Sequence, residues 1–344
     1  MLKASPKTYW LYGDTALAVI RRFGVVNSLV MGIRFLFTRI QFKLRVISPI
    51  TMPPNYYLFM TKRCNLSCSF CHYHSELDKS DVVNDEWEWK VEDLASFEKK
   101  GILKRRSKVC LYGGEPMLNA DFFACIDYLN NHNYLSSTIT NAAFVTKNLN
   151  KLLSSPLHQM TVSYYKGIAD QHVKSLREIS HHTILNISYI LTQETYHHLE
   201  EVILFSLKVG ARFITIENLI EKESCSKHAV HSSDDYKLFK RDMIEKYGSQ
   251  IIMRWSEVKK PHSAKGKIEC SEPWDMILLD KKGRILPCCQ YPLSEFEDTL
   301  ANEKFATQSL IEIRKKMKSN IVPRGCEGCH YLYAKDPLYN LKEM

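Results

Sequence analysis

The 344-residue sequence has no uninterrupted apolar run of the roughly 18–20 residues that a membrane-spanning helix needs. No small-residue cleavage site follows a short apolar core, so we expect no secretory signal and a cytoplasmic location. Internal repeats and low-complexity tracts are also missing. A content of 45% hydrophobic and 11% aromatic residues excludes a largely disordered chain.

Acidic residues are almost absent from the first 55 positions. This segment has eight Lys or Arg residues and one acid, Asp14, so it holds +7 of the net charge of +9. A cationic amphipathic helix can lie in a membrane interface or bind an anionic partner. Two interpretations stay open: residues 15–46 make peripheral contact with acidic lipid at the inner membrane face, or these helices pack on the protein with their arginines toward water. Nucleic-acid binding is not expected, because the basic segment lacks a known docking motif. The segment contains apolar residues at helical spacing: Ile33, Leu36, Phe37, Ile40 and Leu44.

Cysteine, by contrast, is plentiful. Eleven cysteines are an odd number for a disulfide framework, and seven of them have ligand-like spacing in two clusters. This pattern is typical of metal binding in a reducing compartment. Buried structural thiols are the simpler interpretation of Cys110, Cys125 and Cys225.

The first cluster, Cys64, Cys68 and Cys71, directly follows the apolar stretch Tyr56–Met60. Iron–sulfur cubanes usually have four Cys ligands. Three thiolates leave one iron open to a small molecule, and an amino acid can bind there through its amine and carboxylate. We expect Phe70, just before the third Cys, to shield the cluster and touch an adenine ring.

The second motif, Gly113-Gly114-Glu115-Pro116, follows the next apolar stretch. Two glycines let the backbone approach a ligand closely and adopt positive φ. Glu115 supplies an anionic acceptor for an ammonium group, and Pro116 fixes the turn. Alone this motif is weak, because a Gly-Gly turn after a strand is common. The motif becomes a specific signal here because it follows the next strand after a three-cysteine loop.

Together the two motifs resemble those of the radical SAM superfamily. The resemblance covers roughly residues 55–220. It implies a 4Fe–4S cluster with S-adenosylmethionine (SAM) on its open iron, the methionyl amine lying near Gly113, Gly114 and Glu115. It also implies reductive cleavage of SAM to methionine and a 5′-deoxyadenosyl radical that abstracts a substrate hydrogen. An external one-electron reductant such as flavodoxin or ferredoxin is the implied partner. The alternative interpretation of the three cysteines is a zinc site or an electron-transfer site.

Alternating strands and helices between 55 and 220 predict an α/β fold, a partial (β/α)6 TIM-like barrel with reactive groups at the carboxyl ends of its strands. We predict strands at 56–60, 109–112, 137–140, 161–164, 185–191 and 213–217. Helices are expected at 87–100, 121–132, 146–154, 169–180 and 195–209. The predicted domains are a basic helical extension (1–54), the barrel (55–220), a connector with one helix near 234–247 (221–267) and a small Cys-rich domain (268–344).

Further family positions fall at later strand ends. Asn141 lies where the third strand would end near the cofactor, and Ser163 matches the serine of the fourth-strand motif. Tyr165 replaces the aspartate usual in peptide-acting relatives, and Glu217 ends the sixth strand. A satisfied polar strand end explains each of these residues equally well. The sequence offers no convincing general base; Tyr165, Glu217 and Cys289 are candidates.

The last cluster comprises Cys270, Cys288, Cys326 and Cys329. Cys270 and Cys288 flank a predicted hairpin that turns at Gly283, and a helix near 310–317 precedes the final pair. Four thiolates suit an iron–sulfur cluster or structural zinc. The run resembles the first half of a SPASM or twitch domain, which implies an auxiliary 4Fe–4S cluster. Because no further cysteine follows, we expect one such cluster. Cys289 is either a spare thiol or the true ligand of its pair.

The predicted function is that of a radical SAM oxidoreductase or maturase with one auxiliary cluster. Its substrate would be a peptide side chain, or a sugar, small polar molecule or lipid-linked group. The alternatives are an iron–sulfur electron-transfer or binding protein without its own turnover, and a zinc-stabilised scaffold. Cys225, His228 and His231 have metal-like spacing, which is most simply a coincidence among thirteen histidines.

Overall fold

The structure is a computed structural model, and its contacts divide the chain into two compact units. The first, here called the β1 unit, comprises Thr15–Ile139 and Ser271–Glu327. The second, the β4 unit, comprises Met1–Asp14, Thr140–Cys270 and Gly328–Met344. The described residues are 6–48, 50, 53–69, 71, 73, 87–155, 157–219, 234–255, 267–289, 291, 308–327, 329 and 332–333.

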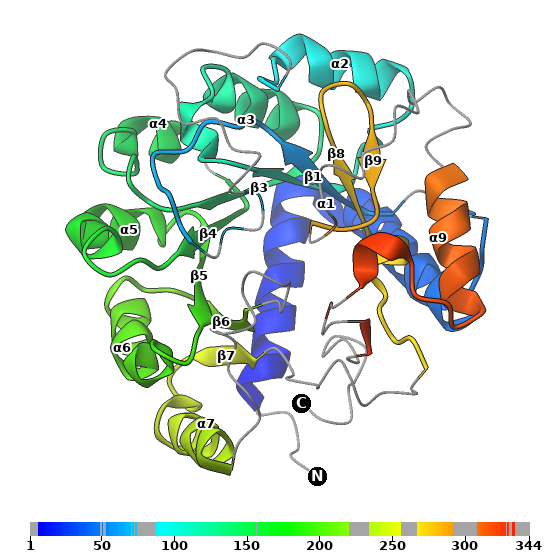
Figure 1. Cartoon of the computed structure of the whole chain (residues 1–344). Coiled ribbons are helices and arrows are strands. Elements are labelled where there is room, and N and C mark those ends of the chain that lie inside the picture. The colour runs from blue at the N-terminus through cyan, green and yellow to red at the C-terminus, as the bar shows by residue number, and fades with distance from the viewer. Residues whose placement is uncertain are drawn as a thin grey trace. The chain divides into compact units, whose positions relative to one another are not determined.

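Parallel strands form the centre of the β1 unit, in the order β3-β2-β1-β8-β9 (Figure 1). β1 lies between β2 and β8 and is parallel to both, whereas β9 returns antiparallel to β8. Leu58 and Phe59 are fully buried, as expected for a strand with neighbours on both edges and cover on both faces. The strands are β1 (Asn55–Phe59), β2 (Lys108–Tyr112), β3 (Leu135–Thr140), β8 (Met276–Leu279) and β9 (Ile285–Leu286). The helices are α1 (Pro6–Lys43, in this unit from Thr15 onward), α2 (Val91–Lys99), α3 (Phe122–Asn131), α8 (Glu272–Asp275) and α9 (Gln308–Lys318), with short 3-10 turns η2 (Pro116–Leu118) and η8 (Arg324–Cys326).

The β4 unit continues the strand–helix alternation, with parallel strands in the order β7-β6-β5-β4. Helices α4, α5 and α6 follow one another along the outer side of these strands (Figure 1). The strands are β4 (Gln159–Ser163), β5 (Ile184–Leu191), β6 (Phe213–Asn218) and β7 (Ile252–Trp255). The helices are α4 (Leu149–Ser154), α5 (Val173–Ile179), α6 (Leu199–Lys208) and α7 (Asp234–Tyr247), with 3-10 turns η3 (Ala169–His172) and η4 (Tyr196–His198).

The α/β fold predicted from the sequence is confirmed, and each of the six predicted strands is present. The hairpin after Cys270 is also present, with Gly283 at a φ of 81° in its turn. Strand β7, which follows α7, was not predicted. The parallel pairing of the first hairpin strand, β8, with β1 was not predicted either; an Asn55–Asp275 hydrogen bond beside it joins residues 220 positions apart. The four-part domain division stays a prediction.

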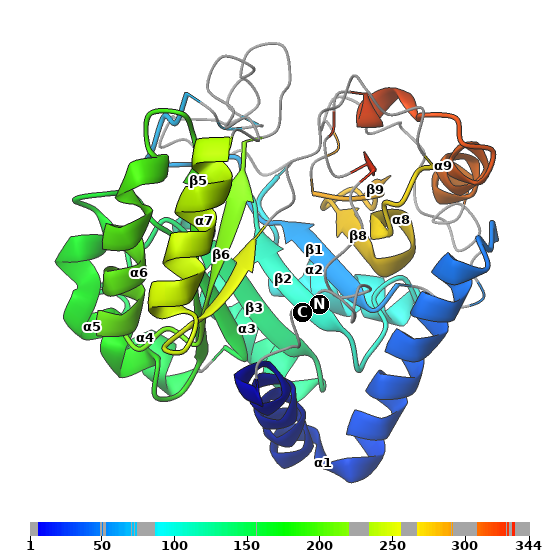
Figure 2. The ribbon, with the colours of Figure 1, turned by 90° about the horizontal axis from the view of Figure 1, so that it is seen from below.

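Helix α1 is kinked at Gly24, whose backbone angles (φ 76°, ψ 166°) are not helical (Figure 2). Its second segment is fastened to the β1 unit by Arg34, whose Nη1 donates to the carbonyls of Arg105 and Arg106 at 3.0 and 3.2 Å and to Ser107 Oγ at 2.8 Å. Arg34 therefore faces the protein, whereas Arg21 is exposed. The two interpretations of this basic segment both stay open.

Replacing Arg34 should loosen this helix. Arg34→Gln removes three charge-assisted hydrogen bonds, so we expect the free energy of unfolding to fall by about 1–3 kcal/mol. Urea unfolding followed by circular dichroism measures the change, with Arg21→Gln on an exposed position of α1 as the control. Equal stability of the two variants would show that the Arg34 contacts do not hold the helix.

Candidate active site

The first cysteine loop begins directly beyond the carboxyl end of β1. Cys64, Cys68 and Cys71 are all half-buried, and the Cys71 amide donates to the Cys68 carbonyl at 3.1 Å, which closes a tight turn between them. Phe70, the predicted adenine contact, lies outside the described residues. The loop therefore places three thiols at the strand end, where parallel α/β folds bind their ligands.

The glycine turn after β2 lies against this loop. The Glu115 amide donates to the Arg63 carbonyl at 2.8 Å, one residue before Cys64. Gly114 has a φ of 45°, and a Cβ at this position would lie 2.2 Å from the Arg63 carbonyl oxygen and 2.8 Å from that of Thr61. Only glycine fits between two strand ends at this separation. The motif thus holds the start of the cysteine loop.

A buried charged network fixes Arg63 itself. Its Nε and Nη2 each lie 3.2 Å from a carboxylate oxygen of Glu88, which is 5% exposed. Asn119 Nδ2 donates to the same carboxylate at 3.0 Å, and the Thr61 hydroxyl donates to it as well. Bidentate Arg–carboxylate pairs combine strength with fixed geometry. Sequence reasoning missed these residues, because Glu88 and Asn119 belong to no motif and are distant from Arg63 along the chain.

Negative charge is concentrated around the first thiol. Burial raises the pKa of Cys64 most, and the charges of Glu115, Cys68 and Cys71 raise it further against a backbone hydrogen bond that lowers it. Among the residues that the structure describes, no three His, Cys, Asp or Glu side chains converge tightly enough to hold a bare metal ion. The three thiols are close enough to influence one another, and a polynuclear iron cluster would bridge wider gaps and neutralise this charge. The donor set fits such a group.

Four aromatic rings enclose the end of β1. Phe59 packs edge-on against Tyr73, Trp87 and Tyr112, with ring centroids 5.5, 5.5 and 5.9 Å away. A Cβ on Gly113 would lie 2.6 Å from the Phe59 ring, so the glycine turn also packs on this cluster. The arrangement builds an apolar wall beside the cysteine loop.

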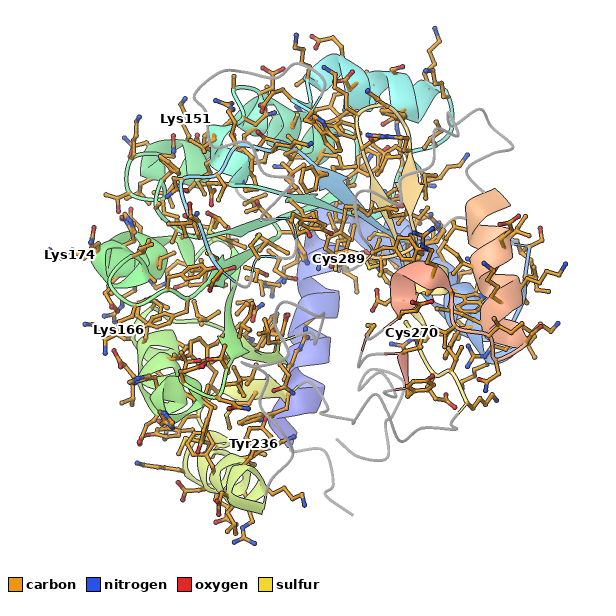
Figure 3. The ribbon with its side chains drawn as sticks, in the orientation of Figure 1. Lys151, Lys166, Lys174, Tyr236, Cys270 and Cys289 are labelled. Atoms are coloured by element: carbon orange, nitrogen blue, oxygen red, sulfur yellow. The ribbon has the colours of Figure 1, made fainter. Side chains whose placement is uncertain are left out.

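The same aromatic cluster contacts the later cysteines. The hydroxyls of Tyr73 and Tyr112 both donate to the carbonyl of Cys289, the Tyr112 bond at 3.3 Å (Figure 3 labels Cys289). Burial, followed by nearby Tyr73 and Cys289, raises the pKa of Tyr112 well above its ordinary value, so its hydroxyl keeps its proton. The Cys288–Cys289 pair is therefore fastened to the wall of the first cysteine site within the β1 unit.

The four predicted auxiliary ligands are grouped in pairs. In the β1 unit, the Tyr291 amide donates to the Cys288 carbonyl at 3.2 Å, and the Tyr291 ring packs so closely on Gly325 that a Cβ there would lie 2.3 Å away. Tyr291 thus connects the segment that follows Cys288 with the turn that contains buried Cys326. In the β4 unit, the Cys270 amide donates to the Leu332 carbonyl at 3.1 Å, and the Leu332 amide donates to the Cys329 carbonyl at 3.2 Å.

The remaining predicted site residues lie in the β4 unit. Asn141 follows β3, and its Oδ1 accepts from the Ala143 amide at 3.0 Å. Ser163 ends β4, and Tyr165 lies two residues beyond it with its carbonyl accepting from the Ile168 amide at 3.1 Å. Glu217 lies near the end of β6, and burial raises its pKa. All four occupy carboxyl ends of strands, and their roles stay predictions.

Two cysteines outside the clusters are buried. Cys110 on β2 is 3% exposed and Cys125 on α3 is fully buried, and burial is the first cause of a raised pKa in both. These are inert packing thiols, as the sequence predicts. Cys225, His228 and His231 lie outside the described residues.

Several curated proteins are similar in sequence to part of this chain. The chain is 26% identical to the PqqA peptide cyclase of Bradyrhizobium diazoefficiens over 47% of its own length and 45% of that protein. It is 25% identical to a probable GTP 3′,8-cyclase of Methanococcus maripaludis over 50% of its length and 62% of the relative. The chain thus matches less than two thirds of either relative. No protein-family model matches. The chain belongs to the radical SAM superfamily.

Solved structures of radical SAM enzymes share the fold. SuiB of Streptococcus suis with bound S-adenosylmethionine has a TM-score of 0.55 at 16% identity, covering 84% of this chain and 67% of SuiB. AnSMEcpe with bound AdoMet also has a TM-score of 0.55, at 18% identity, covering 82% of this chain and 85% of anSMEcpe. At such identities the likeness concerns the fold alone: a radical SAM partial barrel. The superfamily implies a three-cysteine 4Fe–4S cluster and SAM.

A methyl group at Gly114 tests whether the glycine turn holds the cysteine loop. Gly114→Ala forces a Cβ against two backbone carbonyls that cannot move independently of the loop. We expect at least about a tenfold loss of SAM binding, measured by equilibrium dialysis on anaerobically reconstituted protein.

Gly167→Ala is the matched control. Gly167 also has a positive φ of 83°, yet a Cβ there meets nothing within 4 Å. It therefore carries the backbone strain without the clash, and its SAM binding should stay within about twofold of the unsubstituted protein. Equal losses in the two variants would refute the role of close approach at Gly114.

The carboxyl of half-buried Glu217 should make stability depend on pH. Because burial raises its pKa, the folded chain favours the protonated acid. Its contribution is complete below the ordinary pKa of about 4.3 and is lost as pH rises through the raised value. Glu217→Gln should therefore stabilise the protein more at pH 8 than at pH 4.5 in urea unfolding. Glu178→Gln, on exposed α5, controls for loss of charge, and a Glu217→Gln effect independent of pH would contradict this assignment.

Proposed function

We propose that the chain is a radical SAM enzyme that removes hydrogen from a peptide side chain with the help of one auxiliary 4Fe–4S cluster. The observation that carries this proposal is the pair of hydrogen bonds from Tyr73 and Tyr112 to Cys289, which attaches the later cysteines to the wall of the first cysteine site. An auxiliary cluster placed this way can accept an electron from a substrate radical, which suits a net oxidation.

The protein's part in this reaction is positioning. When bound, the first cluster and SAM supply a 5′-deoxyadenosyl radical that takes a hydrogen atom from the substrate. Cys64, Cys68 and Cys71 would hold that cluster. Glu115, which is fully buried, would accept the methionyl ammonium beside the two glycines. The aromatic wall around Phe59 excludes water, which protects a reactive species from quenching.

A second cluster is proposed on Cys270, Cys288, Cys326 and Cys329. The hydrogen bonds to the Cys289 carbonyl leave the thiols of both neighbours able to ligate, so Cys288 is proposed with Cys289 as the alternative ligand of this pair. Structural zinc would use the same thiols. Metal analysis of protein purified without oxygen decides between them: about eight irons per chain support two clusters, and zinc would overturn the assignment.

A peptide is the proposed substrate class. Its support is the similarity to a PqqA peptide cyclase and the shared fold of SuiB bound to its precursor peptide SuiA and of anSMEcpe bound to a peptide. A nucleotide is the second candidate, because the GTP 3′,8-cyclases are relatives of comparable identity. Flavodoxin or ferredoxin would supply the electron.

Cysteine variants separate the two clusters. Cys68→Ala should abolish 5′-deoxyadenosine formation in the presence of a chemical reductant. Cys326→Ala should lower the iron content by about four per chain and leave SAM cleavage intact. Cys125→Ala, a buried thiol outside both clusters, should change neither iron content nor cleavage.

Mass spectrometry tests the substrate class. The chain should be co-expressed with any short peptide encoded beside its own gene, and loss of two mass units from that peptide, absent with Cys68→Ala, supports peptide oxidation. An unchanged peptide together with turnover of GTP would overturn the peptide assignment in favour of the nucleotide. A chain that binds iron yet forms no 5′-deoxyadenosine would instead be an electron-transfer protein.

A further inference from the structure

The second segment of α1 carries an exposed apolar face. Its members are 42–74% exposed although all are large aliphatic or aromatic residues. Steps of three and four positions place them on one side of the helix. We call this set the α1 outer face: Val25, Val26, Leu29, Ile33, Leu36, Phe37, Ile40 and Leu44. Over twenty residues it is about 30 Å long, more than the scattered apolar side chains normal on a soluble surface.

The opposite side of the same segment is packed on the β1 unit. Arg34 binds the chain just before β2, and Phe23 and Met31 pack against Leu135 at the start of β3. Phe42 packs edge-on against Trp274, whose indole donates to the Val46 carbonyl at 2.8 Å. The helix is therefore held in place, with its outer face turned away from the unit.

The positive charge of this segment favours an anionic partner. No Asp or Glu occurs between residues 15 and 55, and exposed Arg21 and Lys43 lie near the two ends of the outer face. Two copies of so positive a segment would repel each other, whereas anionic lipid headgroups attract it. Cations that flank an apolar helix face are the pattern of interfacial membrane helices.

The stretch Phe23–Lys43 is also long and apolar enough to cross a membrane by length and composition, because an 18-residue window of it contains only Arg34 and Arg39 as charged residues. The sequence criterion of an uninterrupted apolar run does not detect this stretch, because Arg34 and Arg39 interrupt it. Crossing would require breaking the Arg34 hydrogen bonds and exposing Thr38 and Gln41, which are 1% and 2% exposed, to lipid. A helix lying in the interface keeps these contacts.

We propose that the α1 outer face docks the protein on an anionic bilayer, with the helix lying in the membrane interface. The helix contacts Ser107 and Leu135, at the amino ends of β2 and β3, whereas Cys64 and Gly114 follow the carboxyl ends of β1 and β2. One strand length, about 17 Å, separates these edges. The docked protein thus presents its cysteine loop away from the lipid, toward a water-soluble substrate.

Flotation of the full chain with vesicles tests the docking surface independently of any activity. The protein should float with vesicles of phosphatidylcholine and phosphatidylglycerol at 3:1 and less with phosphatidylcholine alone. Leu29→Gln/Leu36→Gln should weaken binding by about tenfold or more, since two apolar side chains no longer enter the interface. The matched control, Leu204→Gln/Leu238→Gln, alters leucines of similar exposure on α6 and α7 and should bind normally.

Equal flotation of the two double variants would overturn the proposal. So would a dimer in size-exclusion chromatography that Leu29→Gln/Leu36→Gln dissociates while neither protein floats, because the occupant would then be a second copy. Resistance of the membrane-associated chain to alkaline carbonate extraction would show a spanning helix instead. Hydrogen exchange on vesicles should slow in residues 25–44 and stay unchanged in residues 61–69; protection of the latter would contradict the orientation.

Discussion

The structure depends on the close approach of two strand ends. The Glu115 amide reaches the Arg63 carbonyl because Gly114 has no side chain, and this single contact ties the turn after β2 to the loop after β1. Parallel strands end at the same edge of a sheet, but their loops do not by themselves stay together. Here a backbone hydrogen bond and the buried Arg63–Glu88 pair fix the chain one residue before the first cysteine. These contacts position the segment that carries the three thiols.

The same glycine turn explains how the first cysteine site is connected to the later cysteines. Phe59 fills the space that Gly113 leaves open, and its ring supports Tyr73 and Tyr112, which hold the Cys289 carbonyl. Strand β8 lies directly beside β1, so the hairpin that carries Cys288 and Cys289 starts in the same sheet as the first site. Two groups of cysteines far apart in sequence therefore share one aromatic wall.

The sequence predicted the features that depend on local chemistry. Six strands, the glycine turn and the three-cysteine loop follow from apolar runs, backbone freedom and thiol spacing. It did not predict the pairing of β8 with β1, because parallel pairing over such a separation leaves no local pattern. The partners of Arg63 were missed for the same reason. Periodicity predicted an amphipathic α1, but it does not say which side meets the protein, and Arg34 rather than the apolar stripe does so.

The central claim is that the loop fixed by Gly114 leaves one iron of a three-cysteine cluster open to SAM. Electron paramagnetic resonance of reduced, oxygen-free Cys326→Ala protein tests this directly, because this variant removes a ligand of the proposed second cluster and leaves the first site to dominate the signal. The account predicts a 4Fe–4S signal whose g values shift when SAM is added. A signal that SAM leaves unchanged, or no iron–sulfur signal in protein that remains folded, would contradict it.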